Sequence, residues 1–198
     1  MKKIKTEDGT FTLRSEEYDE CYSSKSGALE EAQKKYVIPC NIKEGDLVLD
    51  IGFGLGYNVA AAIEKGARVI SLEKDSRLLN EIQDLNLPIK SYDLVKKIAK
   101  GEESEKLKII LGDARETIKE LNMKFDAVFL DPFSPPKNPE LWTEEFFKEI
   151  KKRMKKTAIL ATYSCARKVR ENLINVGFIV KDGPIIGRRS PSTLAINK

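Results

Sequence analysis

The chain has 198 residues, and 35 lysines and arginines against 31 aspartates and glutamates give it a formal net charge of +4. A chain of this length forms one domain with a sizeable core, and the mild basic excess permits a nucleic-acid partner without requiring one. It contains no histidine and three widely spaced cysteines, Cys21, Cys40 and Cys165. This composition excludes histidine-dependent nucleophiles and argues against a disulfide framework or a zinc site. We therefore predict no metal site.

The sequence also lacks the segments that direct a chain to a membrane. The first ten residues, MKKIKTEDGT, have no apolar core of the kind found in a signal peptide. No apolar run approaches the ~18 residues that a membrane-spanning helix needs. We expect a soluble, cytoplasmic protein.

The first 40 residues differ in pattern from the rest of the chain. Residues 8–20, DGTFTLRSEEYDE, alternate briefly between polar and apolar, and residues 26–39 have the pattern of a helix. Ser26 is a candidate N-cap for this helix, and Pro39 limits its far end. We assign residues 1–40 to an N-terminal extension that packs on a core domain formed by residues 41–198.

From about residue 46 onward, short apolar runs alternate with helical segments. The predicted strands are 47–51, 67–73, 107–111, 125–130, 157–163, 177–181 and 193–197. The predicted helices are roughly 57–65, 75–86, 91–100, 114–121, 142–155 and 165–175. This alternation indicates an α/β fold with a parallel sheet covered on both faces. The short, helix-free link 182–192 favours an antiparallel hairpin between the last two strands.

A glycine-rich loop, 49-LDIGFGLG-56, lies between the first core strand and the helix that follows. Its glycines, Gly52, Gly54 and Gly56, are spaced differently from those of dinucleotide-binding folds, and the loop lacks the Gly-Lys-Ser/Thr of a P-loop. Glycines at such a position let the backbone approach a ligand closely. The carboxylate of Asp50 is a poor neighbour for pyrophosphate and a good one for an ammonium group.

Three successive predicted strands each end at an acidic residue: Asp50, Glu73 and Asp113. Ligands of open α/β sheets bind outside the carboxyl ends of the strands. We expect Asp50 to bind a cationic tail, Glu73 two ribose hydroxyls and Asp113 an adenine amine, a set that fits S-adenosylmethionine. The alternative is three surface acids that cap helices. We add the neighbouring residues Gly52, Phe53, Gly54, Gly56, Asn58, Lys74 and Ala114 to the predicted cofactor contacts.

With its D-x-G-x-G-x-G loop and second-strand acid, the chain resembles class I methyltransferases. The resemblance implies a Rossmann-like, seven-stranded, mostly parallel sheet with an antiparallel last strand.

The fourth core strand ends at Asp131, within 126-DAVFLDPFSPPKNPELW-142. Asp131-Pro132-Phe133 resembles the D-P-P-aromatic motif of amino-group methyltransferases, in which the carboxylate accepts a hydrogen bond from the acceptor nitrogen and the ring packs against a base. We predict Asp131 as the catalytic residue and Phe133 as a stacking partner for the base. The alternative is that Asp131 only caps the turn.

The resemblance becomes specific over residues 131–142, DPFSPPKNPELW, which are similar to the D-x-F-x-P-x-K-N-P-x-x-W signature of the MnmC family. Residues 6–32 and 162–178 resemble two further blocks of that family. Its methyltransferase domain acts in tRNA 5-methylaminomethyl-2-thiouridine biosynthesis. The resemblance implies N-methylation of 5-aminomethyluridine at the tRNA wobble position, with S-adenosylmethionine as cofactor and the anticodon region as partner.

This sequence also departs from the family pattern. Tyr22-Ser23-Ser24 stands where the family has Y-H-S, and the ending GRRSPSTLAIN differs from the bacterial tail. We expect a stand-alone form, because no segment resembles the FAD-dependent oxidase half of the bifunctional enzyme.

The family blocks add further site residues. Tyr22 and Gly27 belong to the N-terminal block, which the resemblance places over the cofactor. On the substrate side we predict Lys137, Asn138, Tyr163 and Ser164. Trp142 is predicted as core. Candidate contacts to the tRNA backbone are Arg167, Lys168, Arg170, Arg188 and Arg189.

Three rival functions remain open from the sequence. The first keeps the fold and changes the amine acceptor to another nucleic-acid base or a protein. The second is aminopropyl transfer of the spermidine-synthase kind, which also uses acids at strand ends. The third is a non-catalytic nucleic-acid-binding module, and the oligomeric state is open as well.

Overall fold

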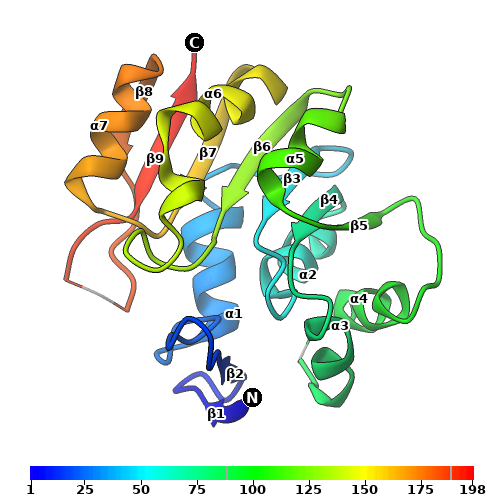
Figure 1. Cartoon of the computed structure of the whole chain (residues 1–198). Helices are drawn as coiled ribbons and strands as arrows, with labels where there is room; N and C mark the ends of the chain where they lie inside the picture. The colour runs from blue at the N-terminus through cyan, green and yellow to red at the C-terminus, as the bar shows by residue number, and fades with distance from the viewer. Residues whose placement is uncertain (88, 188) are drawn as a thin grey trace.

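The computed structural model describes residues 1–87, 89–187 and 189–198. In this part of the chain, seven strands form one sheet in the order β5-β4-β3-β6-β7-β9-β8 (Figure 1). The strands are β3 (Leu47–Ile51), β4 (Arg68–Glu73), β5 (Leu107–Leu111), β6 (Phe125–Leu130), β7 (Met154–Thr162), β8 (Phe178–Asp182) and β9 (Thr193–Asn197). The pairs among β3 to β7 are parallel, whereas β9 is antiparallel to both β7 and β8. The predicted fold class and the terminal hairpin are confirmed.

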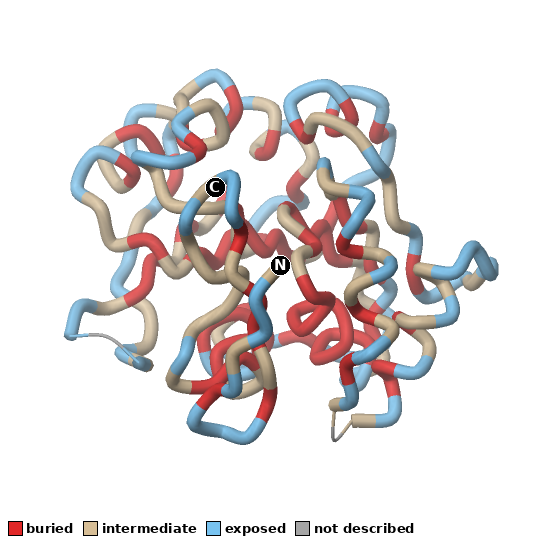
Figure 2. The backbone as a smooth tube through the Cα atoms, turned by 60° about the horizontal axis from the view of Figure 1, so that its bottom comes forward, coloured by how far each residue is buried: buried red, intermediate tan, exposed pale blue. Residues whose placement is uncertain are grey.

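The central strands β3 and β6 contribute to two hydrophobic cores, one on each face of the sheet. Successive side chains of a strand point to opposite faces. Val48, Ala127 and Phe129 therefore belong to one core, and Leu49 and Val128 to the other. This explains why both strands read as continuous apolar runs. Figure 2 shows the buried backbone gathered in the middle of the molecule.

Helices cover both faces. The core that contains Val48 includes residues of the N-terminal helical segment and of α2 (Tyr57–Glu64), α3 (Leu78–Glu81) and α4 (Ser91–Ala99). The opposite core includes residues of α5 (Ala114–Thr117), α6 (Glu144–Arg153) and α7 (Arg167–Asn175). Two predicted helices are shorter than expected, because α3 and α5 each pass into a 3₁₀ turn, over Ile82–Asp84 and Ile118–Glu120.

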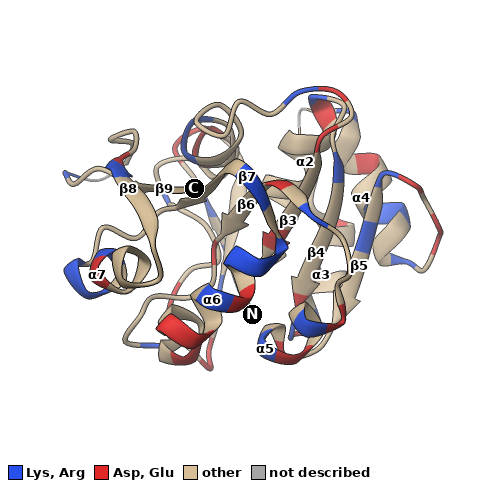
Figure 3. Ribbon diagram, turned by 90° about the horizontal axis from the view of Figure 1, so that it is seen from above, with Lys and Arg blue, Asp and Glu red and all other residues tan. Residues whose placement is uncertain are grey.

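The helix predicted at 142–155 begins and ends differently in the structure. A 3₁₀ turn over Pro139–Trp142 precedes it, and the Thr143 hydroxyl caps α6 by accepting the N–H of Phe146 at 3.2 Å. The helix ends at Arg153, and β7 begins at Met154 rather than at the predicted residue 157. The basic run 151–156 therefore spans the end of α6 and the start of β7 (Figure 3).

The N-terminal segment has its own small sheet, in which β1 (Lys2–Lys5) pairs antiparallel with β2 (Phe11–Arg14). The sequence does not predict β1, because this strand is mostly exposed and polar. A helical segment follows, with α1 (Ala28–Glu31) continuing into a π-helical turn over Ala32–Val37. It ends two residues before Pro39, as predicted.

The predicted N-cap at Ser26 is wrong. Helix α1 starts after Gly27, and the carboxylate of Asp8 accepts the N–H groups of Leu29 and Glu30, each at 3.2 Å. A Cβ at Gly27 would lie 2.9 Å from the Asp8 carboxyl carbon, so glycine lets this distant acid reach the helix start. Asp8 lies nineteen positions before Gly27 in the chain, so this cap cannot be recognised from the local sequence.

Candidate active site

A cavity of about 840 Å³ lies at the carboxyl ends of β3, β4, β5 and β6. The strand ends form one wall, and residues 17–26 of the N-terminal segment contribute another. Of the described residues that line the cavity, nine are acidic and three are basic. A cavity this acidic, in a chain whose net charge is +4, favours cationic ligands over phosphates.

The glycine loop lies directly against the loop that follows β6. Gly52 has a φ of +95°, in the left-handed region that favours glycine, and a Cβ there would lie 2.8 Å from the carbonyl oxygen of Asp131. At Gly54, with a φ of +54°, a Cβ would make only an ordinary contact with the Tyr22 ring, at 3.7 Å. The first glycine therefore permits close packing of two loops, and the second leaves backbone open towards the cavity.

Glu73, at the end of β4, is held in place by backbone N–H groups. One carboxylate oxygen accepts from Lys74 and Asp75 at 2.7 Å each, and the other accepts from Gly54 at 3.0 Å. Burial raises the pKa of Glu73, and these hydrogen bonds oppose the rise. The carboxylate thus joins two loops at the cavity wall and keeps lone pairs for further donors.

Asp50 is fully buried beneath the glycine loop and does not itself line the cavity. Its Oδ2 accepts a hydrogen bond from the Ser71 hydroxyl at 2.5 Å, whereas Oδ1 has no partner among the described residues. Burial raises the pKa of this carboxyl well above its usual range. A buried oxygen without a donor is costly, which makes Oδ1 available to a donor group of a ligand.

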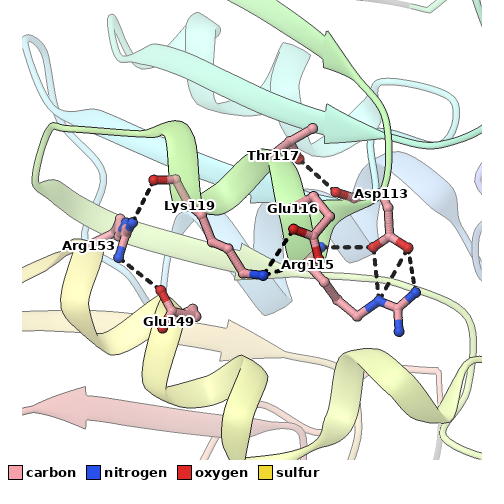
Figure 4. Close-up of polar contacts among 7 residues, drawn as sticks. All are labelled: Asp113, Arg115, Glu116, Thr117, Lys119, Glu149 and Arg153. Carbon is pink, nitrogen blue, oxygen red and sulfur yellow. Dashed lines mark hydrogen bonds and ion pairs between the residues drawn. The ribbon is translucent and has the colours of Figure 1, made fainter.

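Asp113 lines the cavity, but its carboxylate is already engaged by Arg115 (Figure 4). It caps α5 by accepting the N–H of Arg115 at 2.9 Å, and it forms a two-point ion pair with the guanidinium at 2.6 and 3.0 Å. Hydrogen bonds from Arg115 lower its pKa. Arg115 is not among the predicted site residues, and an adenine amine would have to share the Asp113 carboxylate with its guanidinium.

The carboxylate of Asp131, at the tip of β6, is held from two sides. Oδ1 accepts a hydrogen bond from the Tyr36 hydroxyl at 2.5 Å, and Oδ2 accepts one from the Asn58 amide at 2.8 Å. Burial and the nearby charge of Glu31 raise the pKa of Asp131 to about 7. Asn58 lines the cavity too, so the residue predicted as a cofactor contact is also an anchor for the predicted catalytic acid.

Tyr36 reaches Asp131 from the π-helical turn. In this turn the N–H of Ile38 donates to the carbonyl of Gln33 at 2.9 Å, a five-residue repeat that often marks functional sites. The neighbouring Lys35 pairs with Glu31 at 2.5 Å, and both side chains are buried. Tyr36, Lys35 and Glu31 are not among the predicted site residues; for Tyr36 and Lys35 the reason is that an α-helical repeat does not predict the register of a π-turn.

Phe133 is covered by two tyrosines of the N-terminal segment. Tyr18 stacks on it with ring centroids 4.2 Å apart, and Tyr22 lies tilted at 5.0 Å. The backbone N–H of Ser134 donates to Glu20 at 3.0 Å, and the Ser134 hydroxyl donates to the same carboxylate. The N-terminal segment is thereby tied to the loop that carries Asp131.

Two of the residues predicted to contact the substrate, Asn138 and Tyr163, line the cavity. Asn138 is buried and lines the cavity, with its amide donating to Glu140 at 2.7 Å. Tyr163 also lines the cavity, and its hydroxyl donates to the carbonyl of Pro132 at 2.9 Å. Trp142 is buried, as predicted, and its indole N–H donates to the carbonyl of Phe133 at 3.0 Å.

The cavity brings together most of the predicted site. The predicted residues that line it are Tyr22, Gly52, Phe53, Gly54, Asn58, Glu73, Lys74, Asp113, Ala114, Asp131, Phe133, Asn138 and Tyr163. The predicted residues that do not line it are Gly27, Asp50, Gly56, Lys137 and Ser164. Gly56 instead precedes α2, where a Cβ would lie 2.9 Å from Val95. Ser164 is buried, whereas Lys137 is exposed.

The cations predicted to contact the tRNA backbone differ in whether other groups of the protein already bind them. Arg170 is engaged by Asp182, Thr193 and Ser192, and Arg167 pairs with Glu171 while remaining highly exposed. Lys168 and Arg189 are exposed, and Arg188 lies outside the described residues.

Across the described ranges, no group of three or more acidic, cysteine or histidine side chains is arranged to hold a metal ion. In the same ranges no helix is long and apolar enough to cross a membrane.

The sheet order, the glycine loop and the acids at the strand ends together define a class I methyltransferase fold with its ligand cavity. A family model described as S-adenosyl-L-methionine-dependent methyltransferase matches residues 81–198. The chain belongs to this family.

Similar proteins show which members of this family the chain resembles. The crystal structure of MnmC2 from Aquifex aeolicus superposes with a TM-score of 0.90 at 39% identity, covering 100% of this chain and 70% of that one. Uncharacterized protein MJ0670 of Methanocaldococcus jannaschii is 35% identical over 97% of this chain and 58% of its own length. The tRNA 5-methylaminomethyl-2-thiouridine biosynthesis bifunctional protein MnmC of Leptospira borgpetersenii is 27% identical, over 90% of this chain and 32% of that protein.

The chain is therefore an MnmC-like methyltransferase domain, as the resemblance implied, with S-adenosyl-L-methionine as the family's cofactor. It spans about 58% and 32% of the lengths of these two curated relatives. Membership of an enzyme family that transfers methyl groups disfavours aminopropyl transfer and a purely binding role.

Proposed function

We propose that this protein methylates the aminomethyl nitrogen of 5-aminomethyluridine, or of its 2-thio form, at the wobble position of tRNA. The observation that carries the proposal is the placement of Asp131, held by Tyr36 and Asn58 in the same cavity as the glycine loop. The Leptospira relative's name, which specifies a methylaminomethyl nucleoside of tRNA, supports this acceptor.

The residues around the glycine loop fit S-adenosylmethionine. Glu73 is positioned to accept from ribose hydroxyls, and the orphan Oδ1 of Asp50 suits the ammonium of the amino-acid tail. Ala114 and Asp113 are assigned to the adenine, with Phe53 and Lys74 as further contacts. When bound, the cofactor supplies an electrophilic methyl group on a sulfonium centre.

Asp131 is assigned to the acceptor amine. An alkylammonium must lose a proton before its nitrogen can attack, and a carboxylate whose pKa is about 7 can accept a hydrogen bond or a proton at neutral pH. Positioning contributes most of the rate enhancement that such a displacement needs. We assign the base of a flipped wobble uridine to the part of the cavity near Phe133, Asn138 and Tyr163.

The RNA is proposed to dock through exposed cations outside the acidic cavity. Lys137 lies on the loop after Asp131, and Lys168 and Arg189 are exposed. Contacts of such residues with phosphates position a nucleic acid without reading its sequence. We further propose that residues 1–40 act as a cover over the core domain of residues 41–198, because Glu20 and Tyr18 contact the Asp131 loop.

The test uses tritiated S-adenosylmethionine and total tRNA from cells blocked at the aminomethyl stage, followed by digestion to nucleosides. Label in 5-methylaminomethyluridine, or in its 2-thio form, is the expected result, and the Asp131→Ala variant should give background only. No label in tRNA from a protein that still binds the cofactor tightly would rule out this acceptor and direct the search to other amines.

A further inference from the structure

A second carboxylate faces the cavity that contains Asp131. Glu31, the last residue of α1, lines the cavity although it is only 8% exposed. Its Oε1 accepts from Lys35 at 2.5 Å, and its Oε2 accepts from the backbone N–H of Ser24 at 2.9 Å. Each carboxylate oxygen can accept about two hydrogen bonds, so Glu31 keeps capacity for a donor in the cavity.

The two carboxylates are held by adjacent residues of one turn. Lys35 binds Glu31 and Tyr36 binds Asp131, and both donors lie in the π-helical turn Ala32–Val37. The turn therefore sets the position of one acid relative to the other. Both carboxylates line the same cavity, and the charge of Glu31 contributes to the raised pKa of Asp131.

A primary amine needs two acceptors to be oriented for attack. When its lone pair points at the sulfonium carbon, its two N–H groups point elsewhere, and a buried N–H without an acceptor is costly. We propose that Glu31 accepts the second N–H of the acceptor amine beside Asp131, and that it thereby restricts the enzyme to transferring a single methyl group. This inference rests on the proposed amine acceptor.

The amine lone pair forms the new N–C bond, the S–C bond of the sulfonium breaks with its electron pair remaining on sulfur, and a secondary ammonium results. That ammonium loses one proton to solvent on release and becomes a secondary amine with one N–H.

A second transfer would place this secondary amine in the same site. Its lone pair must again face the sulfonium, so its existing methyl group takes the direction of one former N–H and meets a buried carboxylate. Sites built to bind an N–H reject analogues that lack it by large factors, because a desolvated acceptor is left unpaired. Glu31 is thus a specificity-determining residue for the number of methyl groups.

The experiment compares two synthetic anticodon stem-loops, one with 5-aminomethyluridine and one with 5-methylaminomethyluridine at the wobble position. The measured quantity is the ratio of kcat/KM for the secondary amine to that for the primary amine. This ratio does not depend on the fraction of enzyme that is folded. If Glu31 only stabilised the fold, its replacement would therefore leave the ratio unchanged.

Two variants test the residue. Glu31→Gln removes one acceptor oxygen and keeps an oxygen for Lys35, and Glu31→Met combined with Lys35→Met replaces the buried ion pair by apolar side chains of similar size. The matched control is Glu30→Met with Lys34→Met, an exposed pair with the same four-residue spacing outside the cavity.

We expect the ratio to rise at least about tenfold in the Glu31 variants, with dimethylated nucleoside detected by mass spectrometry, and to stay at the wild-type value in the control. A ratio within twofold of wild type in the Glu31 variants, or a wild-type enzyme that methylates both stem-loops equally, would overturn this inference and leave the proposed function standing. Failure of the wild type to methylate either stem-loop would instead reject the proposed acceptor and the inference with it.

Discussion

Tyr36 donates a 2.5 Å hydrogen bond to Oδ1 of Asp131, which links the N-terminal helical segment to the tip of β6 across 95 positions of the chain. Tyr36 is itself fully buried and packs at a tilt against Phe129 of β6. The acid that we assign to the acceptor amine is therefore oriented by a residue outside the core domain predicted from sequence. The N-terminal segment therefore supplies a hydrogen bond to the predicted catalytic acid, in addition to the role as a cover that we propose for it.

Removing the Tyr36 hydroxyl should move the pH dependence of methyl transfer. The hydrogen bond lowers the pKa of Asp131, so its loss in Tyr36→Phe should raise that pKa. A hydrogen bond to a charged group contributes about 1.5 kcal/mol, which corresponds to a shift of roughly one pH unit. We expect the midpoint of a kcat–pH profile to move upward. Tyr92→Phe is the control, because its buried hydroxyl donates to the backbone carbonyl of Leu55 and not to Asp131, and it should leave the midpoint unchanged.

Asp131 should control turnover rather than cofactor binding. Because its ionised form accepts the amine N–H, the wild-type rate should rise with pH through about 7 and then level off. Asp131→Ala should lower kcat by roughly a hundredfold or more, in the range of general acid–base and positioning effects, while the Kd for S-adenosylmethionine from calorimetry changes little. Near wild-type turnover in this variant would remove Asp131 from the mechanism.

The same carboxyl should reduce stability at high pH. Its pKa rises from 3.8 to about 7 on folding, so the folded state holds the proton more tightly, and the stability this contributes is lost as pH rises through about 7. Asp131→Asn should therefore raise Tm at pH 8, by about 2–4 °C for each kcal/mol gained. The difference should vanish below about pH 4. A Tm gain that is equal at pH 8 and pH 4 would contradict this explanation.

The two loops that meet at Gly52 should not tolerate a side chain. Gly52→Ala combines a φ of +95° with a Cβ only 2.8 Å from the Asp131 carbonyl oxygen. We expect a loss of both cofactor affinity and stability, the latter by more than about 2 kcal/mol because strain and overpacking add. Gly101→Ala is the matched control: its φ is +97°, and a Cβ there meets no atom of the described residues within 4 Å. Denaturant titration of both variants separates packing from backbone strain.

Glu73 should contribute to cofactor affinity. Replacing it by alanine removes the acceptor proposed for the ribose hydroxyls and releases the N–H of Gly54 that it holds. Two lost hydrogen bonds to a charged group should weaken the Kd for S-adenosylmethionine by more than about tenfold. Glu116→Ala, an exposed acid paired with Lys119, should bind as wild type. Equal affinities in the two variants would disprove the assignment.

The site features that can be predicted from sequence are those that depend on residues close together in the chain. Gly52 and Gly54 are predicted because a turn between a strand and a helix needs glycine. Glu73, Asp113 and Asp131 are predicted because parallel strands carry the residues after their ends to one edge, and all five residues line the cavity. Neither β1 nor the cap supplied by Asp8 follows from the local sequence, since both depend on pairing with distant residues. Asp50 is predicted to contact the ligand, and the structure buries it beneath the glycine loop with its Oδ1 unpaired among the described residues.

The sequence by itself determined the α/β class, the order of strands and helices from residue 46 onward, and which strand ends carry acids, because these follow from local periodicity and from the geometry of parallel strands. Only the tertiary structure decided how the acids that line the cavity are held: Tyr36 and Asn58 on Asp131, Arg115 on Asp113, and Lys35 on Glu31. A π-turn shifts every later side chain around its helix, and whether a polar partner reaches a carboxylate depends on that shift. The physical reason is that hydrogen bonds act over about 3 Å, whereas sequence patterns place an element only to within a few residues.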